Sequence, residues 1–72
     1  MKPDYKSMWD IQTDDWVIIT GGENKGITGR IGGISYKKCN ARVIPDKINK
    51  YIREFKKNIR RITKESDPEF FI

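Results

Sequence analysis

Basic side chains dominate the middle of this 72-residue chain. Between residues 25 and 64 there are 13 lysines and arginines against two acids, Asp46 and Glu54, so this stretch has a net charge of +11. The flanking segments, residues 1–24 and 65–72, each have a net charge of −3. Such a concentration of positive charge is typical of a surface that binds a polyanion, although it also helps to keep a small protein in solution. The charge pattern therefore predicts an anionic partner for the middle of the chain.

Few groups in the sequence are suited to enzymatic chemistry. There is no histidine and one cysteine, Cys39, so the usual zinc ligands and a Cys–His nucleophile pair are both missing. The adjacent acids Asp14 and Asp15 resemble a divalent-metal pair, but the start of a strand explains them more simply. Since no set of base, nucleophile and oxyanion donor can be assembled, we expect a non-enzymatic protein that binds no metal, cofactor or small-molecule substrate.

The length of the chain points the same way. A domain of this size buries only about 60% of its unfolded surface, so we expect function on the surface and not in an enclosed pocket. No stretch of about 18 apolar residues is present, and we expect no membrane partner. A single cysteine predicts a reducing compartment, the cytoplasm or the nucleus.

Two strands are expected near the start of the domain. Residues 15–20 are rich in β-branched and aromatic side chains, which favour extended backbone. Residues 21–26 contain glycines and an asparagine that favour a turn, and residues 27–34 return to a strand-like composition. Glycines in the second strand predict curvature or a bulge. Residues 1–13 are expected to form a lead-in segment whose apolar side chains lie at the edge of the core: Trp9 and Ile11.

A third strand is expected over residues 38–44, where polar and apolar side chains alternate. The polar members should face solvent: Lys38, Asn40 and Arg42. The apolar members should face the core: Cys39, Ala41 and Val43. This interpretation makes Cys39 a small buried hydrophobic residue and not a reactive thiol.

Residues 46–62 fit two different structures. Apolar residues recur there at helical spacing, so periodicity alone predicts an amphipathic helix after Pro45: Ile48, Tyr51, Ile52, Phe55, Ile59 and Ile62. The alternative is a fourth strand near residues 51–55, a tight turn at residues 56–58 and a fifth strand over residues 59–62. The first structure is a three-stranded sheet with a C-terminal helix, and the second is a sheet of about five strands.

The segment from residue 15 to residue 31, DWVIITGGENKGITGRI, resembles the KOW motif of ribosomal large-subunit proteins and NusG-type transcription elongation factors. The shared features are an acidic residue, an alternating apolar strand, a glycine turn, Lys-Gly and then Gly-basic-apolar: Asp15, Val17, Ile19, Gly21, Lys25, Gly26, Gly29, Arg30 and Ile31. Residues 55–62 resemble the closing segment of such proteins more loosely. One departure is Asp14, which stands where the family often has glycine.

The resemblance implies an all-β fold, a small SH3-like barrel of about five antiparallel strands over residues 14–62. Irregular tails would flank it at residues 1–13 and 63–72. Gly26 would let the hairpin turn, and Gly29 would permit close backbone packing. The expected core consists of Val17, Ile19, Ile31, Ile34, Ala41, Val43, Phe55 and Ile59. Related barrels bind RNA, DNA or protein. Because the motif occurs in ribosomal proteins and transcription elongation factors, the resemblance implies a role in the transcription or translation machinery.

Nucleic-acid binding is the first functional hypothesis, with RNA preferred over DNA. The expected phosphate contacts are Lys25, Arg30, Lys37, Lys38, Arg42, Lys56, Lys57, Arg60 and Arg61. Tyr36 lies in an expected turn, where its ring would either stack on a base or fill the core. For Trp16, packing at the core or its edge is favoured over stacking.

A protein-interaction or structural assembly module is the alternative hypothesis. It would use an edge of the barrel and the acidic-aromatic tail of residues 63–72, whose docking side chains would be Phe70, Phe71 and Ile72. The tail could instead fold back on its own domain or lack structure, and the composition favours this second interpretation.

Overall fold

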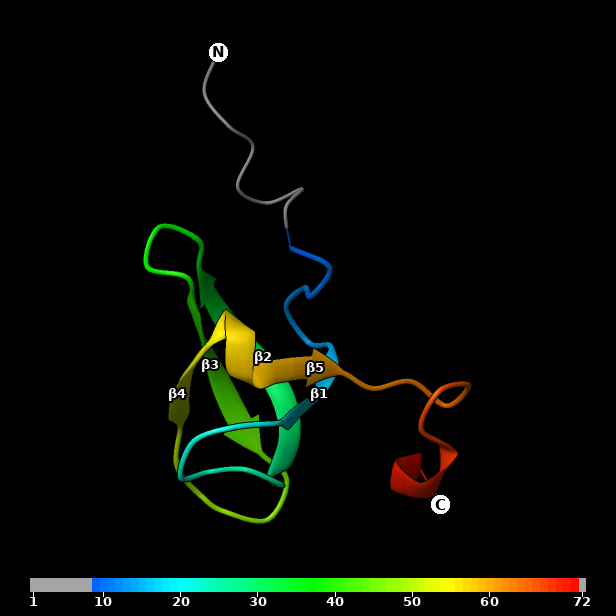
Figure 1. Ribbon diagram of the computed structural model, residues 1–72. Coiled ribbons are helices and arrows are strands. Elements are labelled where there is room, and N and C mark those ends of the chain that lie inside the picture. The colour runs from blue at the N-terminus through cyan, green and yellow to red at the C-terminus, as the bar shows by residue number, and fades with distance from the viewer. Residues whose placement is uncertain (1–8, 72) are drawn as a thin grey trace.

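The computed structural model of the protein describes residues 9–71. In this part of the chain, one antiparallel sheet contains five strands in the spatial order β4-β3-β2-β1-β5 (Figure 1). The strands and two short 3-10 helices follow one another as β1 (Trp16–Ile19), β2 (Thr28–Ser35), β3 (Asn40–Pro45), β4 (Ile52–Phe55), η1 (Lys56–Asn58), β5 (Ile59–Arg61) and η2 (Pro68–Phe71). This confirms the all-β prediction and is consistent with a small five-stranded barrel. Neither of these helices is long and apolar enough to cross a membrane.

The helical interpretation of residues 46–62 is wrong. A loop, β4, η1 and β5 occupy this segment. β4 pairs with β3, where Ile52 lies opposite Val43, and β5 pairs with β1, where Ile59 lies opposite Ile19. These pairs bury apolar side chains against the rest of the sheet, and such tertiary burial outweighs a local helical period.

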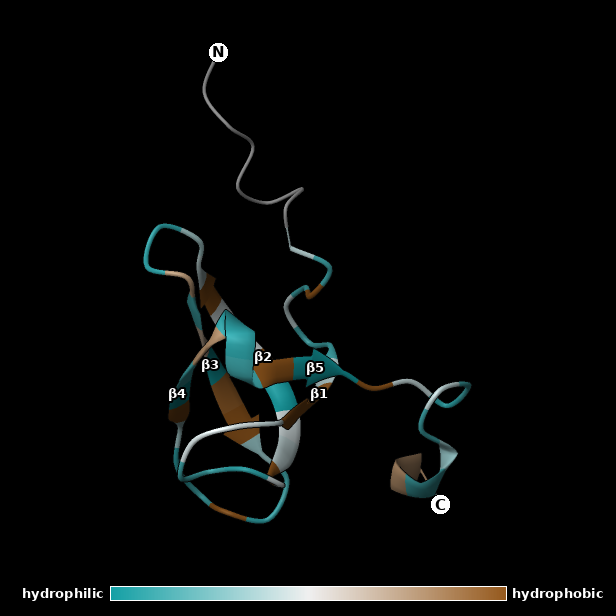
Figure 2. Cartoon of the chain, in the orientation of Figure 1, coloured by the Kyte–Doolittle hydropathy of each residue, from teal (hydrophilic) through white to brown (hydrophobic). Residues whose placement is uncertain are grey.

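The core lies on the inner face of the sheet, where paired residues of neighbouring strands are buried together. Its members are Trp9, Ile11, Val17, Ile19, Ile31, Ala41, Val43, Ile52 and Ile59. In Figure 2 the strands carry hydrophobic segments between hydrophilic ones, as a sheet with one buried face requires. Ile34 is half-buried and packs against this cluster, and Trp9 and Ile11 lie within the core and not merely at its edge.

Phe55 was predicted to be in the core, and this prediction is wrong because 54% of the residue is exposed. The β3–β4 register pairs Ala41 with Glu54, and both are buried. Since successive side chains point to opposite faces of a strand, a buried Glu54 directs Phe55 outward.

Cys39 was also predicted to be buried, but it is exposed. The turn that follows β2 extends through residue 39, and Cys39 itself has a positive φ of 56°. β3 therefore begins at Asn40, two residues later than predicted, and Lys38 belongs to the turn. The alternation from Ala41 to Pro45 holds, with Ala41 and Val43 buried as expected.

Two turns that flank β1 use left-handed backbone. Asp14, before the strand, has a φ of 73°, and its N–H donates to the carbonyl oxygen of Ile31 at 2.8 Å. Gly26, after the strand, has a φ of 95°, and its N–H donates to the carbonyl oxygen of Ile19 at 2.7 Å. The predicted role of Gly26 in turning the hairpin is thus matched by its backbone conformation.

We expect Gly26→Val to lower the free energy of unfolding by more than about 1 kcal/mol. No atom lies within 4 Å of the position that a Cβ would occupy at Gly26, so the cost comes from backbone strain and not from a clash. Thermal unfolding followed by circular dichroism measures the change. A melting temperature equal to that of the parent protein would contradict this account of the turn.

Candidate functional site

The outer face of the β3–β4 edge interleaves cations with exposed aromatic rings. Outward positions along β4 and the residue before it are aromatic, cationic and aromatic in turn: Tyr51, Arg53 and Phe55. Arg42 of β3 lies opposite Arg53 in the register. Tyr51 is 65% exposed, the largest value among the exposed hydrophobic residues described, and Phe55 is 54% exposed.

A shallow hollow of about 270 Å³ lies on this face next to the β2–β3 turn. Three cations from three different segments line it: Lys38 from the turn, Arg42 from β3 and Arg53 from β4. The remaining lining is small, apolar or neutral and polar: Gly33, Ile34, Ser35 and Asn40. No acid is among these lining residues, so nothing in the hollow neutralises its charge. We call it the cationic hollow.

A second hollow, of about 500 Å³, adjoins the first and shares Lys38 with it. Its other lining residues are Cys39, Phe55, Lys56 and Lys57. The ammonium of Lys57 lies 6.0 Å from the centroid of the Phe55 ring, so the exposed ring has a cation beside it. We call this second site the aromatic hollow.

Two guanidinium groups are held against aromatic rings on the outer face. The guanidinium carbon of Arg42 lies 4.9 Å from the centroid of Tyr51, and that of Arg30 lies 5.4 Å from the centroid of Trp16. Such contacts restrict a long flexible side chain while leaving its charge at the surface. Arg42 is therefore partly positioned before any ligand arrives.

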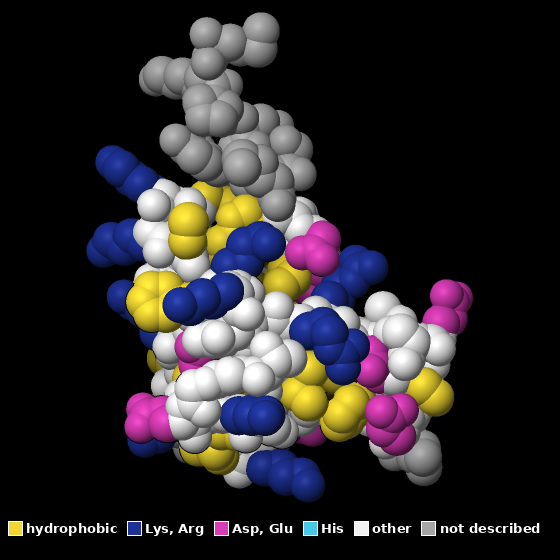
Figure 3. All heavy atoms as spheres, in the orientation of Figure 1, with side chains coloured by type: hydrophobic (Ala, Val, Ile, Leu, Met, Phe, Trp, Pro, Cys, Tyr) yellow, Lys and Arg dark blue, Asp and Glu magenta, His cyan; other side chains and the backbone are white. Residues whose placement is uncertain are grey.

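The structure brings four of the ten predicted nucleic-acid contacts together at the two hollows: Lys38, Arg42, Lys56 and Lys57. Four others are exposed elsewhere on the domain: Lys25 in the β1–β2 loop, Arg30 on β2, Lys37 in the β2–β3 turn and Arg61 on β5. Figure 3 shows lysine and arginine side chains spread over one face with hydrophobic side chains exposed between them.

Tyr36 and Trp16 have partners within the protein. The ring of Tyr36 is half-buried and meets Trp9 edge to face, with centroids 5.5 Å apart. Trp16 meets Phe71 in the same manner at 6.2 Å. Packing therefore accounts for Tyr36, whereas Trp16 remains 36% exposed on the outer face.

Arg60, another predicted phosphate contact, holds the C-terminal tail. Its guanidinium donates two hydrogen bonds to the carboxylate of Asp67, from Nη1 to Oδ2 at 3.1 Å and from Nη2 to Oδ1 at 3.0 Å. Ser66 Oγ donates a third at 2.6 Å. The hydrogen bonds from Arg60 and Ser66 hold the pKa of Asp67 below its ordinary value of 3.8. Together with the Phe71–Trp16 contact, this ion pair fastens the tail to the sheet.

The tail was expected either to dock on a partner or to fold back on its own domain. Figure 1 shows it leaving the sheet beyond β5 and ending in η2. Its contacts with Arg60 and Trp16 agree with the second interpretation. Of the predicted docking side chains, Phe70 is exposed and Phe71 is half-buried, while Ile72 lies outside the described residues.

We expect acid to release the tail from Trp16. Because the pKa of Asp67 is lowered in the folded state, the stabilisation from its pair with Arg60 is present above pH 3.8 and is lost as the pH falls through the lowered pKa. The indole N–H resonance of Trp16 should therefore shift below pH 3.8 in an NMR titration, while methyl resonances of Val43 report that the core stays folded.

Asp67→Asn is the control for this titration. It should show the shifted Trp16 resonance at neutral pH already, since an amide cannot accept both charge-assisted hydrogen bonds from Arg60. A Trp16 resonance that is unaffected by Asp67→Asn would show that the ion pair does not hold the tail.

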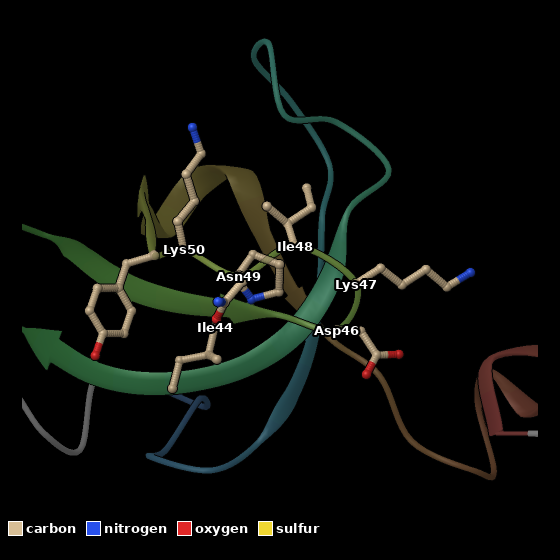
Figure 4. A pocket seen from close by; sticks show the side chains of 8 residues that line it. Ile44, Asp46, Lys47, Ile48, Asn49 and Lys50 are labelled. Atoms are coloured by element: carbon tan, nitrogen blue, oxygen red, sulfur yellow. The ribbon is translucent and has the colours of Figure 1, made fainter.

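A further hollow, of about 580 Å³, lies at the β3–β4 loop. In Figure 4, Ile48 and Lys50 extend to one side of this loop, Ile44 extends to the other, and Lys47 points away from all three. The labelled side chains therefore diverge and do not converge on a common point. A small-molecule site usually has several polar groups that converge on the ligand, and the labelled side chains of this hollow do not form such a set.

No family model matches the sequence, and no curated protein matches it either. Interpretation of the surface therefore depends on its own charge and geometry.

Sequence reasoning missed three members of the site: Tyr51, Arg53 and Phe55. The barrel interpretation placed Phe55 in the core, the helical interpretation placed it on the apolar face of a helix, and neither assigned a role to Arg53. In a strand, alternate residues face the same side, so Tyr51, Arg53 and Phe55 face outward if Ile52 faces the core. The burial of Ile52 opposite Val43 shows that it does.

Proposed function

We propose that this protein is a non-enzymatic nucleic-acid-binding module whose contact surface is the outer face of β3 and β4. The observation that most supports this proposal is the cationic hollow. Lys38, Arg42 and Arg53 converge on it, and the residues that line it include no acid. A phosphate group matches a small, solvent-open site of this charge, and phosphate contacts dominate the affinity of proteins for nucleic acids.

RNA is the preferred ligand in this proposal. Ser35 and Asn40 lie in the cationic hollow beside the three cations. A 2′-hydroxyl both donates and accepts hydrogen bonds, so the hydroxyl of Ser35 and the amide of Asn40 are suitable partners for it. These groups would favour a ribose beside the bound phosphate over a deoxyribose.

The cellular setting follows from the same proposal. Resemblance of residues 15–31 to the KOW motif supports a role in the transcription or translation machinery. A chain with one cysteine and no histidine is suited to the reducing cytoplasm or nucleus and to binding without catalysis.

The test is a titration of the parent protein against single-stranded RNA, single-stranded DNA and duplexes of both, at roughly 50 mM and 200 mM salt. We expect binding that weakens with salt, with a slope of log affinity against log salt near −2 on single strands, since each of three cations contributes about 0.7. Changing Lys38, Arg42 and Arg53 together to alanine should remove most of this binding. Failure of the parent protein to bind any of the four ligands near physiological salt would refute the proposal.

Protein interaction is the second candidate, and exposed apolar side chains at the β3–β4 loop favour it. Ile44 is 46% exposed, Ile48 is 42% exposed and Tyr51 is 65% exposed, and all three line the hollow at this loop. Several large apolar side chains exposed in one region of a small domain are typical of protein contacts. If no nucleic acid binds, this loop becomes the surface to change first.

A further inference from the structure

The two hollows on the outer face differ in chemistry but share one wall. Lys38 lines both, together with Arg42 and Arg53 in the cationic hollow and with Phe55 in the aromatic hollow. One hollow therefore suits an anion, and its neighbour offers the surface of an exposed aromatic ring. A ligand that fills both must carry a negatively charged group a short distance from a flat, stackable one.

A nucleotide unit has this composition, because its phosphate and its base lie on the two sides of one sugar. The base can reach a protein ring only if its own face is free. In a duplex both faces of each base are covered by neighbouring base pairs, whereas in a single strand bases can leave the stack and lie on aromatic side chains. The geometry thus distinguishes between the two forms of nucleic acid.

We infer that the protein binds single-stranded nucleic acid, with one base stacked on Phe55 in the aromatic hollow and the adjoining phosphate among Lys38, Arg42 and Arg53. This inference rests on the proposed function and names its ligand class. The 54% exposure of Phe55 supports it, because an aromatic ring on a strand of so small a domain otherwise leaves apolar surface in water.

A second stacking position lies farther along the same strand. Tyr51 and Phe55 are four residues apart, so their side chains leave the same face of the chain at a separation of about 13 Å in an extended strand. Arg53 lies between them, and Arg42 contacts the Tyr51 ring. Tyr51 and β4 thereby present ring, cation and ring in a row, the combination of stacking surfaces and positive charge that binds single-stranded nucleic acid.

The positive charge around both rings would attract an acidic protein surface as well as a nucleic acid, so the rings are what distinguish the two ligands. An acidic peptide would satisfy Lys38, Arg42 and Arg53, but it has no group that must lie flat on Phe55. The experiment therefore has to separate the contribution of the bases from that of the backbone charge.

The deciding experiment measures the affinity of parent, Phe55→Leu and Ile48→Ala proteins for four labelled probes by fluorescence anisotropy. The probes are a uridine-only RNA strand, a thymidine-only DNA strand, an abasic DNA strand of equal length and a duplex of equal length. Phe55→Leu keeps an apolar side chain but removes the ring face, and Ile48→Ala removes an exposed apolar residue outside both hollows.

Stacking is expected to be worth roughly 5- to 100-fold in affinity for each base. Phe55→Leu should therefore weaken binding of both base-carrying single strands by about that factor, with no change in the salt dependence because no charge is lost. It should leave the weaker binding of the abasic strand unchanged, and Ile48→Ala should match the parent on every probe.

Three outcomes would overturn the inference: equal binding of the base-carrying strands by parent and Phe55→Leu, equal binding of abasic and thymidine strands by the parent, or equal binding of the duplex and single strands. In each case, salt-dependent binding that disappears in the Lys38, Arg42 and Arg53 alanine variant would leave the proposed function standing. A polyglutamate competitor that binds as tightly as the RNA strand would assign the surface to an acidic protein partner.

Discussion

Gly29→Ala is expected to lower the free energy of unfolding by about 2 to 3 kcal/mol. Gly29 lies in β2 opposite Pro45, and a Cβ there would stand 2.9 Å from both the carbonyl carbon of Ile44 and the Cα of Pro45. These are backbone atoms of a paired strand, so they cannot move aside by changing a rotamer. β2 and β3 would have to separate locally, and hydrogen bonds of the ladder would lengthen.

The size of this effect matters because the domain is small. A stability of roughly 0.05 to 0.15 kcal/mol per residue gives this chain about 4 to 11 kcal/mol in total. A loss of 2 to 3 kcal/mol would be a large part of that margin, and we expect Gly29→Ala to unfold at a clearly lower urea concentration than the parent.

Gly33→Ala is the matched control, since it lies in the same strand and adds the same methyl group. No atom lies within 4 Å of the Cβ position at Gly33. Its stability should stay within about 0.5 kcal/mol of the parent or rise slightly, because alanine loses less backbone freedom than glycine on folding. Equal urea midpoints for the two variants would mean that close packing of β2 on β3 is not what requires glycine at position 29.

The parts of the fold that could be predicted are those in which local chemistry and global packing agree. Residues 15–20 and 27–34 contain strand-forming side chains on both sides of a glycine turn, and β1 and β2 form there, with β2 ending one residue later than predicted, at Ser35. Alternation in the third segment likewise places Ala41 and Val43 in the core. In each case the nearest neighbours in sequence are enough to choose the backbone conformation.

For residues 51–55, the sequence does not show which side chains face the core and which face solvent, because the pattern fits either orientation. The order is aromatic, apolar, cationic, acidic and aromatic, and hydrophobicity alone favours burying the less polar of the two rings, that of Phe55. The structure instead buries Glu54, whose Oε1 accepts a hydrogen bond of 3.0 Å from Asn58 Nδ2. A buried carboxylate is tolerated where it has hydrogen-bond partners, and its partner lies in η1, which the strand pattern alone does not position.

The candidate site was predicted only in part for a related reason. Lys38, Arg42 and Arg53 are spread over 16 positions of the sequence and meet only through the β2–β3 turn and the β3–β4 register. The number of lysines and arginines in the sequence identifies the basic region. It does not distinguish cations that line one hollow from a cation that is paired with an acid, as Arg60 is with Asp67. That distinction depends on tertiary contacts and not on composition.

Arg42→Glu is expected to weaken single-stranded nucleic-acid binding by about tenfold or more near 0.15 M salt. The substitution removes a phosphate contact from the cationic hollow and adds a carboxylate where its lining residues include none. The slope of log affinity against log salt should become shallower by at least about 0.7, the value for one lost contact on a single strand. Fold stability should change little, since Arg42 is exposed and its contact with Tyr51 is worth about 1 kcal/mol at such a site.

Lys64→Glu is the matched control for net charge. Both substitutions reduce the net charge of the protein by two units, but Lys64 is exposed in the C-terminal segment, which follows β5 at the opposite edge of the sheet from β4. If the cationic hollow binds phosphate, Arg42→Glu must lower affinity far more than Lys64→Glu does, with both variants equally folded by circular dichroism. If the two variants weaken binding equally, the ligand responds to the overall charge of the domain, and the convergence of Lys38, Arg42 and Arg53 has no role in recognition.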